Sequence, residues 1–242
     1  MPPGEPEGEL LTWPGARCGL AMLVAARDGQ PMLTALWPFT TDGAEHEIRI
    51  DKVSLAPDRL QAVIEGTIGD TLSLAWLDVQ FAVDRAYYAA GSVHQVVLAG
   101  IAHQFDVGAP PPVRIAPDAP NYQVLRQELD AEALDDDGAI VVHTDGMAAI
   151  FPLDGAPMTL HSIQGPVKRI DEYGGEMFGR KIWRLRITVA RIGDGYDTDV
   201  DLDVFLTDVV LDGRLLPAVG DDVSATVRLQ GRIWRPNVQR FR

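Results

Sequence analysis

The sequence predicts a mainly β protein made of two small, barrel-like antiparallel β domains, with one short helix in the segment that connects them. The chain has 23 glycines and 17 prolines, which separate many short apolar runs as turn residues do in all-β proteins. Hydrophobic residues make up 46% of the chain but aromatic residues only 7%, so the cores should consist mainly of Val, Leu, Ile and Ala.

The first β domain is expected at residues 10–109, after a loose tail at residues 1–9. Ile48 and Ile50 alternate with charged neighbours, which is typical of a strand with one buried and one solvated face. Turn residues such as the Gly69-Asp70 pair separate one apolar run from the next. The strands expected in this domain are residues 20–26, 32–37, 47–55, 60–68, 72–83 and 93–105.

A connector rich in proline and aspartate is expected at residues 110–157. It starts with three consecutive prolines, which cannot donate the hydrogen bonds that a central strand needs. A helix is predicted over residues 121–134, because Asn121 can cap it and Tyr122, Leu125 and Leu129 fall on one face.

The second β domain is expected at residues 158–242. A loose internal repeat relates residues 72–105 to residues 200–234, since each reads as a strand, a connection and a longer strand. The strands expected in this domain are residues 159–170, 181–191, 198–207 and 223–234.

The end of the second domain has a turn followed by a long strand with a late glycine. The turn is Leu216-Pro217-Ala218-Val219-Gly220-Asp221-Asp222-Val223, and the strand runs from Val227 to Trp234 with Gly231 near its end. This pattern resembles the closing part of an OB-fold, in which glycine permits the bend that a closed sheet requires. The resemblance implies an OB-like barrel, whose outer surface can hold single strands or sugars.

Two strands of the second domain carry a candidate ligand-binding face. Arg184 and Arg186 alternate with apolar residues along one strand, and Arg228, Arg232 and Trp234 do so along another. If the two polar rows share a surface, they form a basic platform with an aromatic tip.

A row of carboxylates offers a different interpretation of the same face. Asp197, Asp199, Asp201 and Asp203 alternate along the intervening strand. Antiparallel pairing would set them opposite Arg184 and Arg186 as a cross-strand charge ladder, which would neutralise the platform. The ladder is the favoured interpretation, because rows of exposed charges on strands are usually solvated faces.

No motif indicates a catalytic residue, a metal site or a cofactor. The Asp row has Leu202 where a calcium-binding EF-hand loop needs glycine. His94 and His103 are nine residues apart, which places them on opposite faces of a regular strand. The sequence contains neither the nucleophile elbow of α/β-hydrolases nor a phosphate-binding loop, and Cys18 is the only cysteine.

The formal net charge of −14 disfavours binding of nucleic acid by the whole chain. From residue 165 onward acidic and basic residues nearly balance, so nucleic acid stays open as a partner for the C-terminal domain only. The apolar run at residues 19–26 is too short to cross a bilayer and follows acidic residues, which predicts a cytoplasmic protein without membrane contact.

The leading functional hypothesis is a non-enzymatic binding or assembly module, whose partner is another protein or a second copy of the chain. The first alternative is binding of single-stranded nucleic acid or an anionic glycan by the C-terminal domain. The second is a hydrolase with an unrecognised site between the two domains.

Overall fold

The computed structural model is mainly β, as the sequence predicts. It describes residues 8–14, 17–27, 30–57, 59–78, 80–120, 122–128, 134–177 and 179–235. The strands are β1 (Gly8–Pro14), β2 (Cys18–Arg27), β3 (Gln30–Thr40), β4 (Ala44–Leu55), β5 (Ala62–Ile68), β6 (Leu72–Asp78), β7 (Val93–Val107), β8 (Val113–Ile115), β9 (Ile140–Val142), β10 (Ala149–Pro152), β11 (Leu160–Met177), β12 (Arg180–Ile192), β13 (Thr198–Thr207) and β14 (Asp222–Ile233). The helices are α1 (Phe81–Asp84), α2 (Tyr122–Glu128) and α3 (Asp208–Leu211). None of the helices in the described part of the chain is long and apolar enough to cross a membrane.

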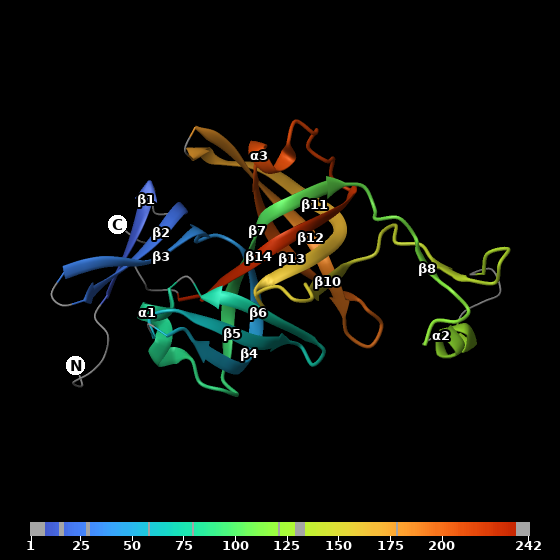
Figure 1. Ribbon diagram of the computed structural model, residues 1–242, viewed down its shortest axis with the longest axis horizontal. Helices are drawn as coiled ribbons and strands as arrows, with labels where there is room; N and C mark the ends of the chain where they lie inside the picture. The colour runs from blue at the N-terminus through green and yellow to red at the C-terminus, as the bar shows by residue number, and fades with distance from the viewer. Residues whose placement is uncertain are drawn as a thin grey trace.

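The first three strands form a separate antiparallel sheet in the order β1-β2-β3. Figure 1 shows this sheet, in blue, beside the larger body of the molecule. Its inner face is apolar and packs on Leu60, Leu77 and Ala82 of the larger body. Of the tail expected at residues 1–9, Gly8 and Glu9 begin β1, and residues 1–7 lie outside the described residues.

A nine-stranded sheet contains most of the remaining strands, in the order β10-β11-β12-β13-β7-β14-β6-β5-β4. Two further pairings, β4 with β7 and β11 with β14, close this sheet into two hydrogen-bonded circuits. One circuit contains β4, β5, β6, β14 and β7, and the other contains β11, β12, β13, β7 and β14. The long strands β7 and β14 therefore belong to both circuits.

The two circuits have matching connectivity. In each, three antiparallel strands are followed by a short helix and a long strand: β4-β5-β6-α1-β7 in one and β11-β12-β13-α3-β14 in the other. The third strand pairs in parallel with the long strand of the other circuit, β6 with β14 and β13 with β7. The two segments of the internal repeat thus occupy equivalent places in the sheet.

One apolar core runs through both circuits. Ile48, Trp76 and Leu98 of the first circuit belong to the same cluster of buried side chains as Leu185 and Leu229 of the second. The prediction of two separate barrels is therefore corrected: strands from both expected domains pair in one sheet, because β7 and β14 are long enough to serve both circuits.

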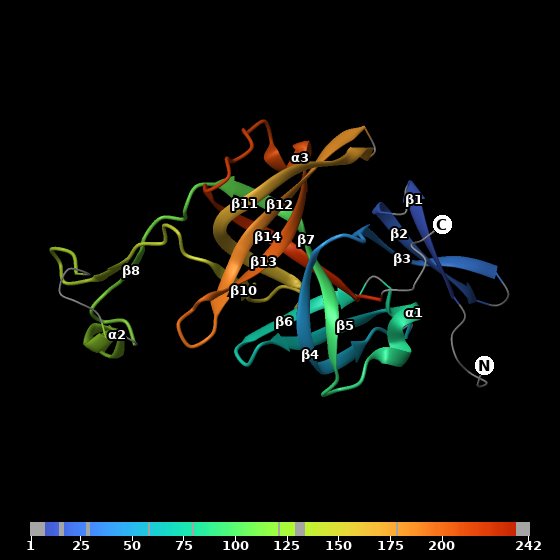
Figure 2. The same ribbon diagram turned by 180° about the vertical axis from the view of Figure 1, so that it is seen from behind.

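The segment that was expected to connect two domains projects from the body on the side away from β1–β3, and Figures 1 and 2 agree in this. It contains the two-stranded sheet of β8 and β9, followed by β10, which joins the large sheet beside β11. Helix α2 ends at Glu128 among the described residues, and Asn121 and residues 129–133 of the expected helix lie outside them.

The strand predicted at residues 72–83 ends at Asp78. The Asp78 Oδ1 atom accepts a hydrogen bond of 2.7 Å from the Gln80 backbone N–H. This is the side-chain-to-backbone bond by which Asp residues form turns, and α1 starts directly after it.

Candidate functional site

The charge ladder expected between β12 and β13 is present in part. Arg186 lies opposite Asp203 and donates two hydrogen bonds to its carboxylate, of 2.8 and 2.9 Å. This contact raises the pKa of Arg186, because the carboxylate stabilises the charged guanidinium. Further along the strands, Arg191 pairs with Asp199 at 3.2 Å. The Asp203 side chain is buried, so this part of the ladder is not the solvated face that the sequence suggests.

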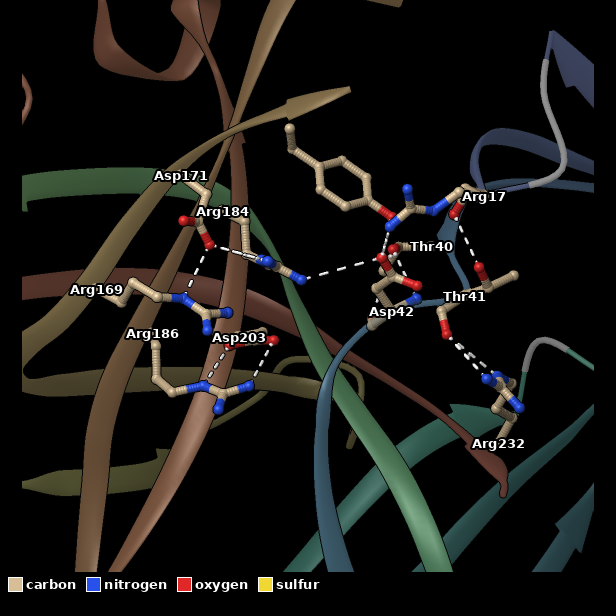
Figure 3. A network of polar contacts seen from close by, with 11 residues as sticks. Arg17, Thr40, Thr41, Asp42, Arg169, Asp171, Arg184, Arg186, Asp203 and Arg232 are labelled. Atoms are coloured by element: carbon tan, nitrogen blue, oxygen red, sulfur yellow. Dashed lines mark hydrogen bonds and ion pairs between the residues drawn. The ribbon is translucent and has the colours of Figure 1, made fainter. Parts of the chain in front are cut away.

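Arg184 is paired differently from the prediction. It lies opposite Phe205, and its guanidinium contacts Asp171 of β11 at 2.9 Å and Asp42 at 3.9 Å (Figure 3). The Asp171 carboxylate also forms an ion pair with the guanidinium of Arg169, at a distance of 2.9 Å. The hydrogen bond from Arg184 and the charge of Arg169 hold the pKa of Asp171 below its usual range.

Asp42, between β3 and β4, joins the small sheet to the large one. It accepts hydrogen bonds from Arg17 and, at 2.8 Å, from the Tyr173 hydroxyl. Burial opposes ionisation of Asp42, but these hydrogen bonds outweigh it and keep the pKa of Asp42 below its usual range. Burial, together with the bond to Asp42, raises the pKa of Tyr173 to about 12. The guanidiniums of Arg17 and Arg184 lie 5.2 and 5.6 Å from the centre of the Tyr173 ring, within cation–π range.

Gln230 and Arg232 of β14 make a second connection between the sheets. The Gln230 side chain donates to the Pro38 carbonyl and accepts from the Thr40 backbone N–H at 3.3 Å. Arg232 donates to the Thr41 carbonyl at 3.2 and 3.1 Å (Figure 3). The alternation that puts Arg228 and Arg232 on the outer side of β14 puts Gln230 there as well, but the end of β3 covers this part of β14 and leaves Gln230 only 1% exposed. No feature of the sequence indicates this cover, since strand periodicity identifies a face but not what lies on it.

The five residues of the expected basic platform do not gather on one open surface. Arg228 lies in the same row as Arg184, but Phe205 and Ile101 stand between them across the sheet. Trp234 lies beyond the end of β14 and is 40% exposed. Their ligand-binding role stays a prediction, and three of them, Arg184, Arg186 and Arg232, already donate to groups of the chain itself.

A small pocket of about 60 Å³ lies between the two sheets. Its lining consists of Cys18, Pro38, Phe39, Thr40, Ile101, Ala102, Ile182, Phe205, Leu206, Thr207 and Val210. Burial raises the pKa of the Cys18 thiol, which keeps it in the poorly nucleophilic protonated form at neutral pH. Among the described residues, the lining contains neither a carboxylate nor an imidazole that could act as the acid or base of a hydrolysis.

Two buried carboxyl groups, which sequence reasoning missed, lie where β6 meets α1. Asp78 is 1% exposed and Asp84 is 2% exposed. Burial raises the pKa of Asp78 to about 7 and that of Asp84 to about 6. Arg235 pairs with Asp84 and lies 3.8 Å from the centre of the Tyr87 ring. Because both carboxyl groups are buried, their ionisation affects the stability of the fold.

Metal binding finds no support in the described part of the chain, where no group of three or more His, Cys, Asp or Glu side chains could hold an ion. His46 instead contacts the Asp201 carbonyl oxygen at 2.7 Å, and His94 contacts the Ser92 hydroxyl at 3.0 Å.

The outer face of the small sheet carries several exposed apolar side chains. Along the strand pairings, Leu11 lies beside Met22, which lies beside Leu36, and Trp13 lies beside Leu20 in the next row. Leu11, Trp13, Leu33 and Leu36 are between 45 and 55% exposed. We call eight of the apolar residues on this side of the sheet the outer apolar face: Leu11, Trp13, Leu20, Met22, Val24, Leu33, Leu36 and Pro38.

Comparison with known proteins gives no relative: no protein-family model, no curated protein and no solved structure matches this chain.

Proposed function

We propose that this protein is a non-enzymatic binding or assembly module that contacts another protein, or a second copy of itself, through the outer apolar face. The observation that carries the proposal is the exposure of four large apolar side chains, Leu11, Trp13, Leu33 and Leu36, on one side of a three-stranded sheet. Contiguous apolar surface of this kind on a folded protein marks a site of interaction.

The chemistry of the other candidate sites supports the same proposal. The small pocket is apolar, and Asp78 and Asp84 are shielded from solvent. The carboxylates and guanidiniums near β12 are engaged with one another, as in the pairs Arg186–Asp203 and Arg184–Asp171. These groups serve the fold, and a binding role needs none of them to react.

We also propose that the two circuits are OB-like barrels that share β7 and β14. The support is the chain order of three antiparallel strands, a short helix and a long strand, which occurs in both circuits. A small five-stranded barrel of this type is a common scaffold for binding.

The alternative is binding of single-stranded nucleic acid or an anionic glycan by the predicted basic platform, whose arginines lie on β12 and β14. The ion pairs of Arg184 and Arg186 weigh against it, because a phosphate would have to displace Asp171 and Asp203. Titration of the full chain with mixed single-stranded DNA and RNA at low salt tests this alternative. Binding that weakens as salt increases, and that is lost in the double variant Arg228→Gln/Arg232→Gln, would favour the alternative over the proposal.

The proposal itself is tested by affinity capture with matched variants. Wild type and the control Leu215→Glu, which alters a residue that is 87% exposed outside the outer apolar face, should retain the same protein. The double variant Leu33→Glu/Leu36→Glu should retain at least tenfold less of it, as expected when charges are placed in an apolar contact. Equal retention by all three proteins would refute the proposed role of this face, and so would a wild type that retains neither another protein nor a second copy of the chain.

A further inference from the structure

The outer apolar face is built as three parallel rows of side chains, the shortest of which contains Val24 and Leu33. Strand pairing sets Leu11, Met22 and Leu36 in one row, and Trp13, Leu20 and Pro38 in the next. The opposite side of the same sheet is already used, since Leu23, Trp37 and Phe39 pack on the larger body. On the outer side, Leu11, Leu33 and Leu36 are between 45 and 55% exposed in the described part of the chain, so this side offers a surface for a second layer.

The charge on this surface indicates what kind of partner fits it. Glu9, beside Val24, is the one charged side chain that strand pairing places on this side among the described residues of β1–β3 whose side chains are placed. A basic partner would find almost no anionic group to pair with here, although the whole chain carries a net charge of −14. A second copy of the chain presents the same uncharged rows, and two stacked sheets bury such rows against each other about 10 Å apart.

The size of the surface sets the strength of the contact. Strands about 4.8 Å apart with a rise of about 3.3 Å per residue give a footprint of roughly 400 Å² for the paired part of the small sheet. Stable dimers bury about 800 Å² per partner, so a contact through this face alone belongs to the weak, reversible class.

We infer that the outer apolar face is the interface of a weak homodimer, in which two copies of the chain stack their small sheets face to face about a two-fold axis. This inference rests on the proposed function and names the partner. A two-fold contact uses the same patch on both copies, so each apolar row packs against its own counterpart or against the neighbouring row.

The effect of salt on the strength of dimerisation should distinguish this apolar dimer from one held together by opposite charges. Two copies with a net charge of −14 each repel one another, and salt screens that repulsion without weakening the apolar contact. Dimerisation should therefore become several-fold stronger as the salt concentration increases. A contact formed by opposite charges would become weaker under the same change.

Sedimentation equilibrium of the full chain over a wide concentration range, at low and at high sodium chloride, tests the inference. The expected result is a monomer–dimer equilibrium with a dissociation constant in the micromolar range, shifted toward the dimer by salt. Leu33→Glu/Leu36→Glu should remain a monomer, and so should the milder pair Leu33→Ser/Leu36→Ser. The control Leu215→Glu should dimerise like wild type, and circular dichroism confirms that each variant is folded.

A wild-type chain that stays monomeric at all concentrations would overturn the inference, as would a dimer that persists in both double variants. Failure of the inference can be distinguished from failure of the proposed function. A monomeric wild type that still captures a different protein through Leu33 and Leu36 refutes only the homodimer. A monomeric wild type that captures nothing refutes both.

Discussion

Arg186 and Asp203 face each other across β12 and β13 and are joined by two parallel hydrogen bonds of 2.8 and 2.9 Å. The Asp203 side chain is 1% exposed, whereas that of Arg186 is 31% exposed. The carboxylate is thus buried with one guanidinium as its counter-ion, and the pair closes this part of the sheet to an incoming anion.

Removal of one partner from this pair should be costly. In Arg186→Met the Asp203 carboxylate is left buried without its counter-ion, and we expect a loss of about 2 to 4 kcal/mol in the free energy of unfolding. The double variant Arg186→Met/Asp203→Leu should recover most of that loss, because no unpaired charge then remains. Urea denaturation measures the free energy of unfolding of the single and the double variant. Arg191→Met is the control, since its pair with Asp199 is exposed and should contribute less than about 1 kcal/mol.

The buried carboxyl groups predict an unusual dependence of stability on pH. The folded-state pKa of Asp78 is about 7, above the ordinary value of 3.8, so the folded state binds more protons than the unfolded state between these pH values. Stability contributed by this group should therefore decrease as pH rises from about 4 to about 7. The Asp84 carboxyl group, with a pKa of about 6, should likewise lower stability as the pH rises.

Asp78→Asn tests this dependence directly. The amide oxygen can still accept the hydrogen bond from the Gln80 N–H, but the side chain no longer ionises. At about pH 8 the variant should be more stable than wild type by about 2 to 4 kcal/mol, and the difference should shrink below about pH 5. Thermal unfolding across this pH range measures the difference in stability. Parallel pH profiles for the two proteins would show that Asp78 does not cause the pH dependence.

Gly165 of β11 should not tolerate a side chain. A Cβ atom at this position would lie 1.8 Å from the Thr188 carbonyl oxygen of β12, so the two backbones would have to separate. We expect Gly165→Ala to lower the free energy of unfolding by about 3 kcal/mol or more. Gly195→Ala is the matched control, because a Cβ there meets nothing within 4 Å, and it should change stability by less than about 0.5 kcal/mol.

Because β7 and β14 belong to both circuits, we can predict which fragments of the chain fold on their own. The fragment 158–242 lacks β7, which pairs with both β13 and β14 in the second circuit. We expect this fragment to show no cooperative thermal transition and poor dispersion of its amide resonances. The fragment 44–235 keeps both circuits and should fold. A cooperatively folded 158–242 fragment would mean that the second circuit closes without β7.

Local patterns account for the parts of the structure that the sequence predicts correctly. Alternation of Ile48 and Ile50 with charged residues marks β4, and the same reasoning marks β12 and β13. The Arg186–Asp203 pair follows as well, because consecutive strands joined by a short turn pair antiparallel, which brings their charged rows together.

The sequence by itself determined the mainly β class, the positions of most strands and the Arg186–Asp203 part of the charge ladder, since each depends on the period of two within a strand and on pairing between neighbours in the chain. Only the tertiary structure decided that β7 and β14 serve two circuits, that Gln230 is covered by β3, and that Asp78 and Asp84 are buried. These features depend on contacts between segments far apart in the chain, and alternation along a strand shows that a face is polar without showing what will cover it.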